Sequence, residues 1–294
     1  MKTGRNKFKG TGVAIVTPFT KSGDIDFAAY KKVMNHIIKG GCEFIVVLGT
    51  TGESPTVSRE EKKDLIAFSV ETNANRIPLV VGIGGNSTAD VVAAVRDSSF
   101  KGIHAVLSVC PYYNKPQQEG VFQHFKAISE ESPVPVIIYT VPGRTGSNIA
   151  ASTTLRLAEE CPNIIGIKEA SGNLDQISRV LKNRPKGFLV ISGDDALTFS
   201  MLALGADGVI SVVANVFPKE FSNMVRYGLK GDFEKARAIH FHLLEFMNAI
   251  FADGSPSGVK AALEIKKLAG NYLRLPLVPV NKETYKLINQ ILIS

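Results

Sequence analysis

Eight short apolar runs recur along the chain, separated by intervals of roughly 20 to 35 residues. Most are rich in β-branched residues and carry few charges, which is typical of buried strands. They are TGVAIVTPF from Thr11, CEFIVVLG from Cys42, IPLVVGIG from Ile77, HAVLSVCP from His104, VPVIIYTVP from Val134, IIGIKEAS from Ile164, FLVISGDD from Phe188 and GVISVVAN from Gly208.

Segments with helical spacing lie between these runs, among them DFAAYKKVMNHIIKG, SREEKKDLIAFSVETNAN and STADVVAAVRDSSF. Two of them carry helix start signals. Ser58 is followed three residues later by Glu61, the pattern of a capping box, and Ser87 leads into Asp90. The alternation of strands and helices predicts parallel strands joined by crossover helices.

Eight strands covered on both faces can close into a barrel, so we expect an α/β fold of the (β/α)8 TIM-barrel type. A doubly wound open sheet is the alternative. The strand signal stops after GVISVVANV, and the remainder contains helical segments broken near DGSPSG and RLPLVPV. We therefore expect a barrel domain over residues 1–225 and a C-terminal helical region over residues 226–294.

Composition narrows the class of protein without indicating its chemistry. The 294 residues are 45% hydrophobic and 21% charged, as in ordinary globular proteins. The net charge of +7 is spread along the chain, which favours neither nucleic-acid binding nor a basic tail, although it could steer small carboxylate substrates. We expect no membrane segment, because no apolar run approaches the length of a transmembrane helix and no apolar stretch follows the basic N-terminus.

The three cysteines, Cys42, Cys110 and Cys161, are widely spaced and show neither a disulfide framework nor a metal-binding spacing. We expect no metal site from them. A reducing, cytoplasmic location is the default for such a chain.

Polar residues gather where the predicted strands end, and in a parallel barrel these ends form the rim that carries catalysis. The segments are GTTGES over 49–54, PYYN over 111–114, YTVPGRTG over 139–146, Lys168, and SGDD over 192–195. We expect them to line one site.

Lys168 is the unusual member of this set, because it stands at the end of an apolar strand. With a period of two, Ile164, Gly166 and Lys168 share one face of the strand, and Gly166 would leave space beside the lysine. Burial disfavours the charged form of an ammonium group, and a neutral amine can attack a carbonyl carbon. Alternatively, Lys168 reaches out to solvent or pairs with Glu169.

The other candidates also have ordinary interpretations. Tyr139, near the end of the preceding strand, could transfer protons or could simply be a core aromatic residue. Thr50 and Thr51, with the backbone N–H groups around them, suit a carboxylate but could form only a turn. Arg144 could bind a carboxylate bidentately or remain solvated at the surface.

Taken together, the ordered motifs GTTGES, PYYN, YxVPxRTG, IIGIKEASG, SGDD and GVISVVAN resemble those of the dihydrodipicolinate synthase family, within the pyruvate-dependent class I aldolases. The resemblance covers the whole barrel and, less distinctively, the C-terminal helices. It implies condensation of pyruvate with aspartate semialdehyde in lysine biosynthesis through diaminopimelate, without a metal or organic cofactor.

By this resemblance Lys168 forms a Schiff base with pyruvate, Tyr139 donates and accepts protons, and Thr50 and Tyr113 are proton-relay partners. The resemblance also makes Thr51 a ligand of the pyruvate carboxylate. It implies the following further substrate contacts: Arg144 for the carboxylate of aspartate semialdehyde, and the backbones of Gly193 and Ile210 along the pocket.

Other implications concern assembly and regulation. Tyr113 would complete the site of a neighbouring subunit, in a homotetramer built from tight dimers. The chain departs from the family pattern at Thr140, where asparagine is usual, and at Pro55 and Lys62, where lysine-inhibited members often carry a small residue and a histidine. Ser54, Asn86 and Tyr112 remain compatible with a lysine site.

Two alternative functions remain at this point. One is a related aldolase or lyase, of the N-acetylneuraminate lyase or 2-keto-3-deoxy-sugar acid type, because the lysine, the tyrosine and the GxTGE motif are shared across the superfamily. The other is a barrel that binds without catalysing, since a fold alone does not fix function.

Overall fold

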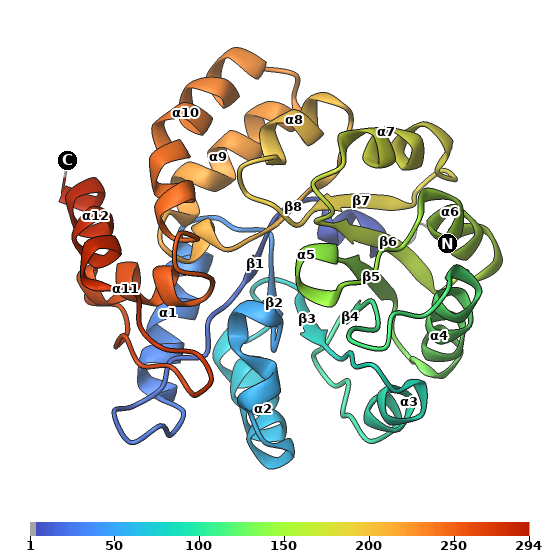
Figure 1. Ribbon diagram of the computed structural model, residues 1–294, viewed down its shortest axis with the longest axis horizontal. Coiled ribbons are helices and arrows are strands. Elements are labelled where there is room, and N and C mark those ends of the chain that lie inside the picture. The colour runs from blue at the N-terminus through green and yellow to red at the C-terminus, as the bar shows by residue number, and fades with distance from the viewer. Residues whose placement is uncertain (1–3, 294) are drawn as a thin grey trace.

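The computed structural model describes residues 4–293, and in this part of the chain eight parallel strands close into a barrel in sequence order (Figure 1). The strands are β1 (Gly10–Ala14), β2 (Phe44–Val47), β3 (Leu79–Gly82), β4 (Ala105–Val109), β5 (Val136–Thr140), β6 (Ile164–Glu169), β7 (Leu189–Ser192) and β8 (Gly208–Ser211). Each coincides with one of the eight apolar runs. The predicted TIM barrel is confirmed, and the open doubly wound sheet is wrong because β8 pairs with β1.

Helices surround the barrel and connect the strands. They are α1 (Phe27–Lys39), α2 (Arg59–Asn73), α3 (Thr88–Arg96), α4 (Gln118–Glu131), α5 (Pro142–Thr145), α6 (Ala151–Glu160), α7 (Leu174–Asn183), α8 (Thr198–Ala203) and α9 (Pro218–Leu229). Short 3₁₀ turns are η1 (Gly4–Phe8), η2 (Thr50–Gly52), η3 (Ser54–Thr56) and η4 (Val213–Asn215). Both predicted caps form: Ser58 and Glu61 make a reciprocal capping box on α2, and Ser87 accepts the Asp90 N–H on α3.

Two apolar layers explain why the strands are hydrophobic on both faces. The interior layer fills the barrel with Phe8, Ala14, Phe44, Val46, Val80, Ala105, Leu107, Ile137, Tyr139, Val141, Ile165, Leu189, Ile191 and Ile210. The larger outer layer packs between the strands and the helices. At the N-terminal end of the barrel the ring of Phe8 packs edge-on against Phe44, with ring centroids 5.6 Å apart.

Strand β6 departs from strict alternation. Its register against β5 shifts, so that Val136 pairs with Ile164 but Ile137 pairs with Gly166. Ile165 therefore joins the interior layer, whereas Ile164 packs in the outer layer. The prediction that Ile164 shares a face with Gly166 and Lys168 is wrong, because the irregularity adds one residue to β6 between them.

The C-terminal region contains α10 (Phe233–Ala249), α11 (Ser257–Ile265) and α12 (Lys282–Ile293), which lie outside the barrel on the side of β1, β8 and α1 (Figure 1). The two breaks predicted from DGSPSG and RLPLVPV fall between these helices. Residue 225 lies inside α9, and the division of the chain at that point stays a prediction. Across residues 4–293 none of the helices is long and apolar enough to span a membrane.

Candidate active site

The C-terminal ends of the barrel strands bring the predicted site residues to one rim, where TIM barrels carry their chemistry. Each residue comes from a different element or loop except the paired threonines. Thr50 and Thr51 are in η2 after β2, Tyr113 follows β4, Tyr139 is in β5, Arg144 is in α5, Lys168 is in β6, Gly193 follows β7 and Ile210 is in β8.

Lys168 and Tyr139 form the centre of the site. They are direct partners across the β5–β6 pair, and the Lys168 Nζ lies 4.3 Å from the centroid of the Tyr139 ring. Each side chain is only 5% exposed. Lys168 therefore does not reach out to solvent, and its amine is held beside a phenol that can exchange protons with a bound substrate.

Glu169 is engaged on the other face of β6. Its carboxylate accepts hydrogen bonds from the Ser171 backbone N–H at 2.7 Å and from the Gln176 amide at 3.0 Å. Burial raises the pKa of Glu169, an effect that these hydrogen bonds only partly offset. The alternative in which Glu169 pairs with Lys168 is not what the structure contains.

The space beside Lys168 comes from Gly193 and not from Gly166. A Cβ atom on Gly166 would lie 2.7 Å from the Leu189 Cβ, so that position is already filled by a neighbouring strand. A Cβ atom on Gly193 would lie 2.9 Å from the Lys168 Cε and 3.1 Å from its Cγ. The predicted role of Gly166 is wrong, because closure of the barrel brings β7, and not empty volume, against it.

The loop that carries Thr50 and Thr51 has a defined and strained backbone. Leu48 and Glu53, on either side of it, have φ angles of 58° and 53°, in the left-handed region that residues with a Cβ rarely adopt. Thr51 is buried and Thr50 is exposed. The Thr17 hydroxyl donates to the Gly52 carbonyl at 2.7 Å, which fixes the end of the turn.

Tyr113 and Arg144 lie near each other in the chain's fold but are exposed. The Tyr113 backbone N–H donates to the Thr145 carbonyl at 3.3 Å, next to Arg144. The Tyr113 side chain is 88% exposed and its φ is 73°, so its own chain hardly covers the ring. Within this chain the structure brings Lys168, Tyr139 and Gly193 together but leaves Tyr113 facing outward.

Two buried polar side chains, Thr140 and Asp195, form hydrogen bonds that hold the loops at the rim in place. The Thr140 hydroxyl donates to the Asn148 side chain at 3.1 Å and accepts from the Ile149 N–H at 3.2 Å. Asp195 accepts the backbone N–H groups of Val212 and Val213 at 3.0 and 3.1 Å, which ties the end of β7 to the loop after β8. Burial raises the pKa of Asp195 to about 6.

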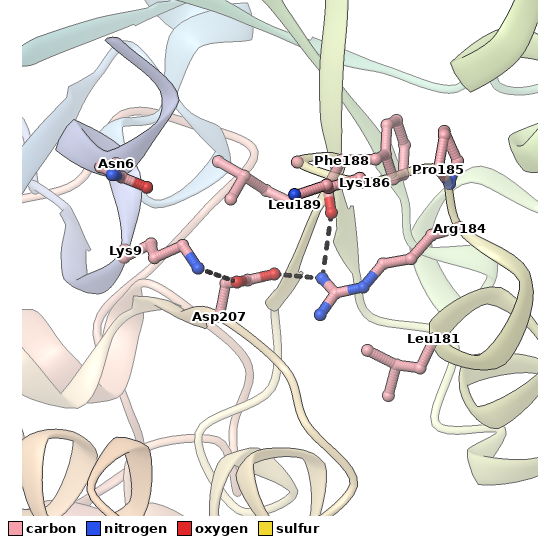
Figure 2. A pocket seen from close by; sticks show the side chains of 10 residues that line it. Asn6, Lys9, Leu181, Arg184, Pro185, Lys186, Phe188, Leu189 and Asp207 are labelled. Carbon is pink, nitrogen blue, oxygen red and sulfur yellow. Dashed lines mark hydrogen bonds and ion pairs between the residues drawn. The ribbon is translucent and has the colours of Figure 1, made fainter. Parts of the chain in front are cut away.

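A cavity of about 540 Å³ lies at the opposite end of the barrel (Figure 2). Asp207 stands at its centre between Lys9, whose ammonium is 2.8 Å from the carboxylate, and Arg184. Arg184 also donates to the Phe188 carbonyl at 3.0 Å. These charges are already paired, and polar groups at this end of a barrel usually serve stability, so we do not place the active site there.

Sequence reasoning missed the side chains that hold the threonine loop. Glu53 stands in the quoted GTTGES motif, but Lys260 and Arg274, which contact it, belong to the C-terminal region where no motif was evident. An isolated lysine in the apolar stretch SGVKAAL was the only available signal.

Comparison with known proteins identifies the family. The family model described as the dihydrodipicolinate synthetase family matches residues 7–294. The chain belongs to this family.

Relatives and solved structures agree with that assignment. A 4-hydroxy-tetrahydrodipicolinate synthase from Parabacteroides distasonis is 49% identical over 284 residues, covering 97% of this chain and 96% of the relative. The enzyme of the same name from Flavobacterium psychrophilum is 51% identical over 276 residues, 94% of each chain. A dihydrodipicolinate synthase structure from Acinetobacter baumannii, complexed with pyruvate, has a TM-score of 0.94 and 38% identity over 97% of this chain and 98% of that one.

The resemblance inferred from the strand-end motifs is thus confirmed at the level of the dihydrodipicolinate synthetase family. The match extends through α10, α11 and α12, so the C-terminal helices belong to the family fold as much as the barrel does.

Proposed function

We propose that the protein catalyses the 4-hydroxy-tetrahydrodipicolinate synthase reaction, the condensation of pyruvate with L-aspartate-4-semialdehyde in the diaminopimelate route to lysine. The observation that carries the proposal is the buried Lys168 amine, 4.3 Å from the centre of the Tyr139 ring at the catalytic rim of the barrel. Relatives of about half identical sequence bear the name of this enzyme.

The first half of the reaction builds a nucleophile from pyruvate. The Lys168 amine attacks the keto carbon of pyruvate, and the carbonyl oxygen leaves as water to give an imine. Tyr139 supplies the proton for the departing oxygen. Loss of a methyl proton then moves an electron pair toward the imine nitrogen and gives an enamine, so the imine itself acts as the electron sink.

The second half forms the ring. The enamine carbon attacks the aldehyde carbon of aspartate semialdehyde, and the aldehyde oxygen becomes the hydroxyl group of the product. The amino group of aspartate semialdehyde then attacks the carbon bound to Lys168, and the carbon–nitrogen bond to the lysine breaks. The enzyme regains its free amine.

Neighbouring groups orient the two substrates. We assign the pyruvate carboxylate to Thr51 and the backbone of η2, and the carboxylate of aspartate semialdehyde to Arg144. The guanidinium group can bind a carboxylate bidentately, and it lies in α5 directly after the strand that carries Tyr139. Gly193 and Ile210 line the pocket, and Thr50 relays protons.

Tyr113 supports a shared active site. Its side chain is 88% exposed and its φ is 73°, so its own chain leaves the ring open to contact with a second copy of the chain. We propose a homotetramer of two tight dimers in which Tyr113 reaches the site of its partner. The three buried free cysteines suit a reducing compartment, and we place the enzyme in the cytoplasm.

Borohydride trapping tests the chemistry. Pyruvate with borohydride should add a three-carbon group to the peptide containing Lys168, and Lys168→Met should abolish both labelling and activity. Lys182→Met, at an exposed lysine on α7, is the matched control and should keep both. Labelling of a different lysine would refute the mechanism, and turnover of sugar aldehydes in preference to aspartate semialdehyde would indicate a related aldolase.

Subunit mixing tests the shared site separately. A Tyr113→Phe chain mixed with a Lys168→Ala chain should regenerate some activity, because mixed dimers contain one site with both wild-type residues. No recovery after verified subunit exchange would contradict the shared site while leaving the lysine chemistry intact.

A further inference from the structure

A fully buried ion pair lies directly beneath the threonine loop. The Glu53 carboxylate contacts the Lys260 ammonium, and both side chains are inaccessible to solvent. Glu53 follows η2, whereas Lys260 lies in α11 of the C-terminal region. The pair therefore joins the loop assigned to the pyruvate carboxylate to a helix outside the barrel.

The Glu53–Lys260 pair and the contacts around it form what we call the anchor of the threonine loop, and further contacts come from the C-terminal side. The Lys260 ammonium donates to the Tyr272 carbonyl at 2.8 Å and lies 4.3 Å from the centre of the Phe19 ring. The Arg274 backbone N–H donates to the second Glu53 oxygen at 3.3 Å. Both carboxylate oxygens of Glu53 thus face groups from the segment after α10.

The side chain of Arg274 fixes that segment in turn. Its guanidinium pairs with Glu61 of α2 and donates to the Thr56 carbonyl at 2.7 Å and the Gly23 carbonyl at 2.8 Å. These partners lie before and after the threonine loop in sequence. The C-terminal segment is therefore attached to the same part of the barrel at several points.

The backbone of Glu53 explains why an anchor is needed. Its φ of 53° is unfavourable for a residue with a Cβ, and its N–H closes the turn by donating to the Thr50 carbonyl at 3.1 Å. A strained residue persists only where its surroundings hold it, and here its carboxylate supplies the contact.

Burial of two charges points to a role in conformation more than in stability. Desolvation offsets most of the attraction within a buried ion pair, so apolar replacements of both partners often fold equally well. Burial lowers the pKa of Lys260, and the Glu53 carboxylate beside it opposes that effect.

We infer that Glu53, held by Lys260 and the Arg274 backbone, is a positioning residue that sets the Thr50–Gly52 turn for binding of the pyruvate carboxylate. The inference rests on the proposed function, which assigns that carboxylate to the turn. It also gives the C-terminal helices a part in substrate binding.

The Glu53→Gln variant tests the inference, because it keeps the shape of the side chain and removes its charge. We expect KM for pyruvate to rise by about 10- to 100-fold, since displacement of a binding group by about 1 Å costs up to 100-fold. The value of kcat at saturating pyruvate should change much less. Glu43→Gln is the matched control: Glu43 precedes β2 at its other end and pairs with Arg226, and its loss should leave KM unchanged.

A double variant separates positioning from folding. Glu53→Gln with Lys260→Met removes both charges, which should restore stability in urea unfolding if the single variant unfolds, while KM stays raised. An unchanged KM in Glu53→Gln, or recovery of the parent KM in the double variant, would overturn the inference. Borohydride trapping in the parent decides the proposed function independently: absence of an adduct there refutes the chemistry and not the anchor.

Discussion

Replacing Gly193 by alanine would test how tightly the side chain of Lys168 is held. The added Cβ would lie 2.9 Å from the Lys168 Cε, 3.1 Å from its Cγ and 2.7 Å from the Ala170 Cβ. Carbon atoms in favourable contact are about 3.5 to 4.0 Å apart, so the Lys168 Cε must move by about 0.6 to 1.1 Å from the added Cβ.

The consequence for catalysis follows from that displacement. A shift of about 1 Å in a reacting group can cost about 100-fold in rate. We therefore expect kcat/KM for pyruvate to fall by about 10- to 100-fold, which corresponds to about 1.4 to 2.7 kcal/mol. Overpacking of this buried region should also lower the free energy of unfolding by about 1 to 3 kcal/mol.

Steady-state kinetics and the rate of borohydride-trapped imine formation measure the effect, with urea unfolding as a check on folding. Gly143→Ala is the matched control, because a Cβ at that position in α5 has nothing within 4 Å. Imine formation at the parental rate in a folded Gly193→Ala enzyme would refute the argument that Gly193 makes room for Lys168.

Three further predictions concern specificity, pH and regulation. Arg144→Lys should lower kcat/KM for aspartate semialdehyde, with a loss of transition-state stabilisation of about 2 kcal/mol, the low end for a charge pair because Arg144 is exposed. Pyruvate should still form its imine, and unchanged kinetics with aspartate semialdehyde would contradict the assignment. Burial raises the folded-state pKa of Asp195 to about 6, so its contribution to stability is largest in acid and is lost as pH rises through 6. When the pH is lowered from 7 to 5, the free energy of unfolding in urea should increase by about 1 kcal/mol more for the parent than for Asp195→Asn. Equal increases in the two proteins would contradict this. Lysine should inhibit only weakly, because the ammonium group of Lys62 would repel the ammonium group of an incoming lysine. Potent inhibition by lysine at millimolar or lower concentration in a steady-state assay would contradict this.

The sequence alone was sufficient for the strands, the helix caps and most of the rim. Each apolar run became one strand of the barrel, and Ser58 and Glu61 formed the capping box that their spacing predicted. Lys168 is buried as expected at the end of its strand. These features depend on residues that are neighbours in the chain, so hydrophobic periodicity and local hydrogen bonding are enough to predict them.

The pairing of the strands, and not the hydrophobic periodicity, determines which residues of β6 face the barrel interior. The register shift between β5 and β6 moved Ile165 into the barrel and Ile164 out of it, and the apolar sequence of β6 does not reveal that irregularity. In the same way, space beside Lys168 came from Gly193 on the next loop, while Gly166 accommodates β7. Both outcomes depend on how adjacent strands are offset when the barrel closes, and that offset is not encoded in one strand.

Only the tertiary structure joined Glu53 to Lys260 and left the Tyr113 ring exposed on its own chain. Within its own segment, Lys260 stands in an apolar stretch, and helical spacing would pair it with Glu264, four residues later. Burial of a charge is costly unless an opposite charge or hydrogen bonds compensate for the lost water. The carboxylate that compensates Lys260 comes from a distant part of the chain, and folding alone brings the two into contact.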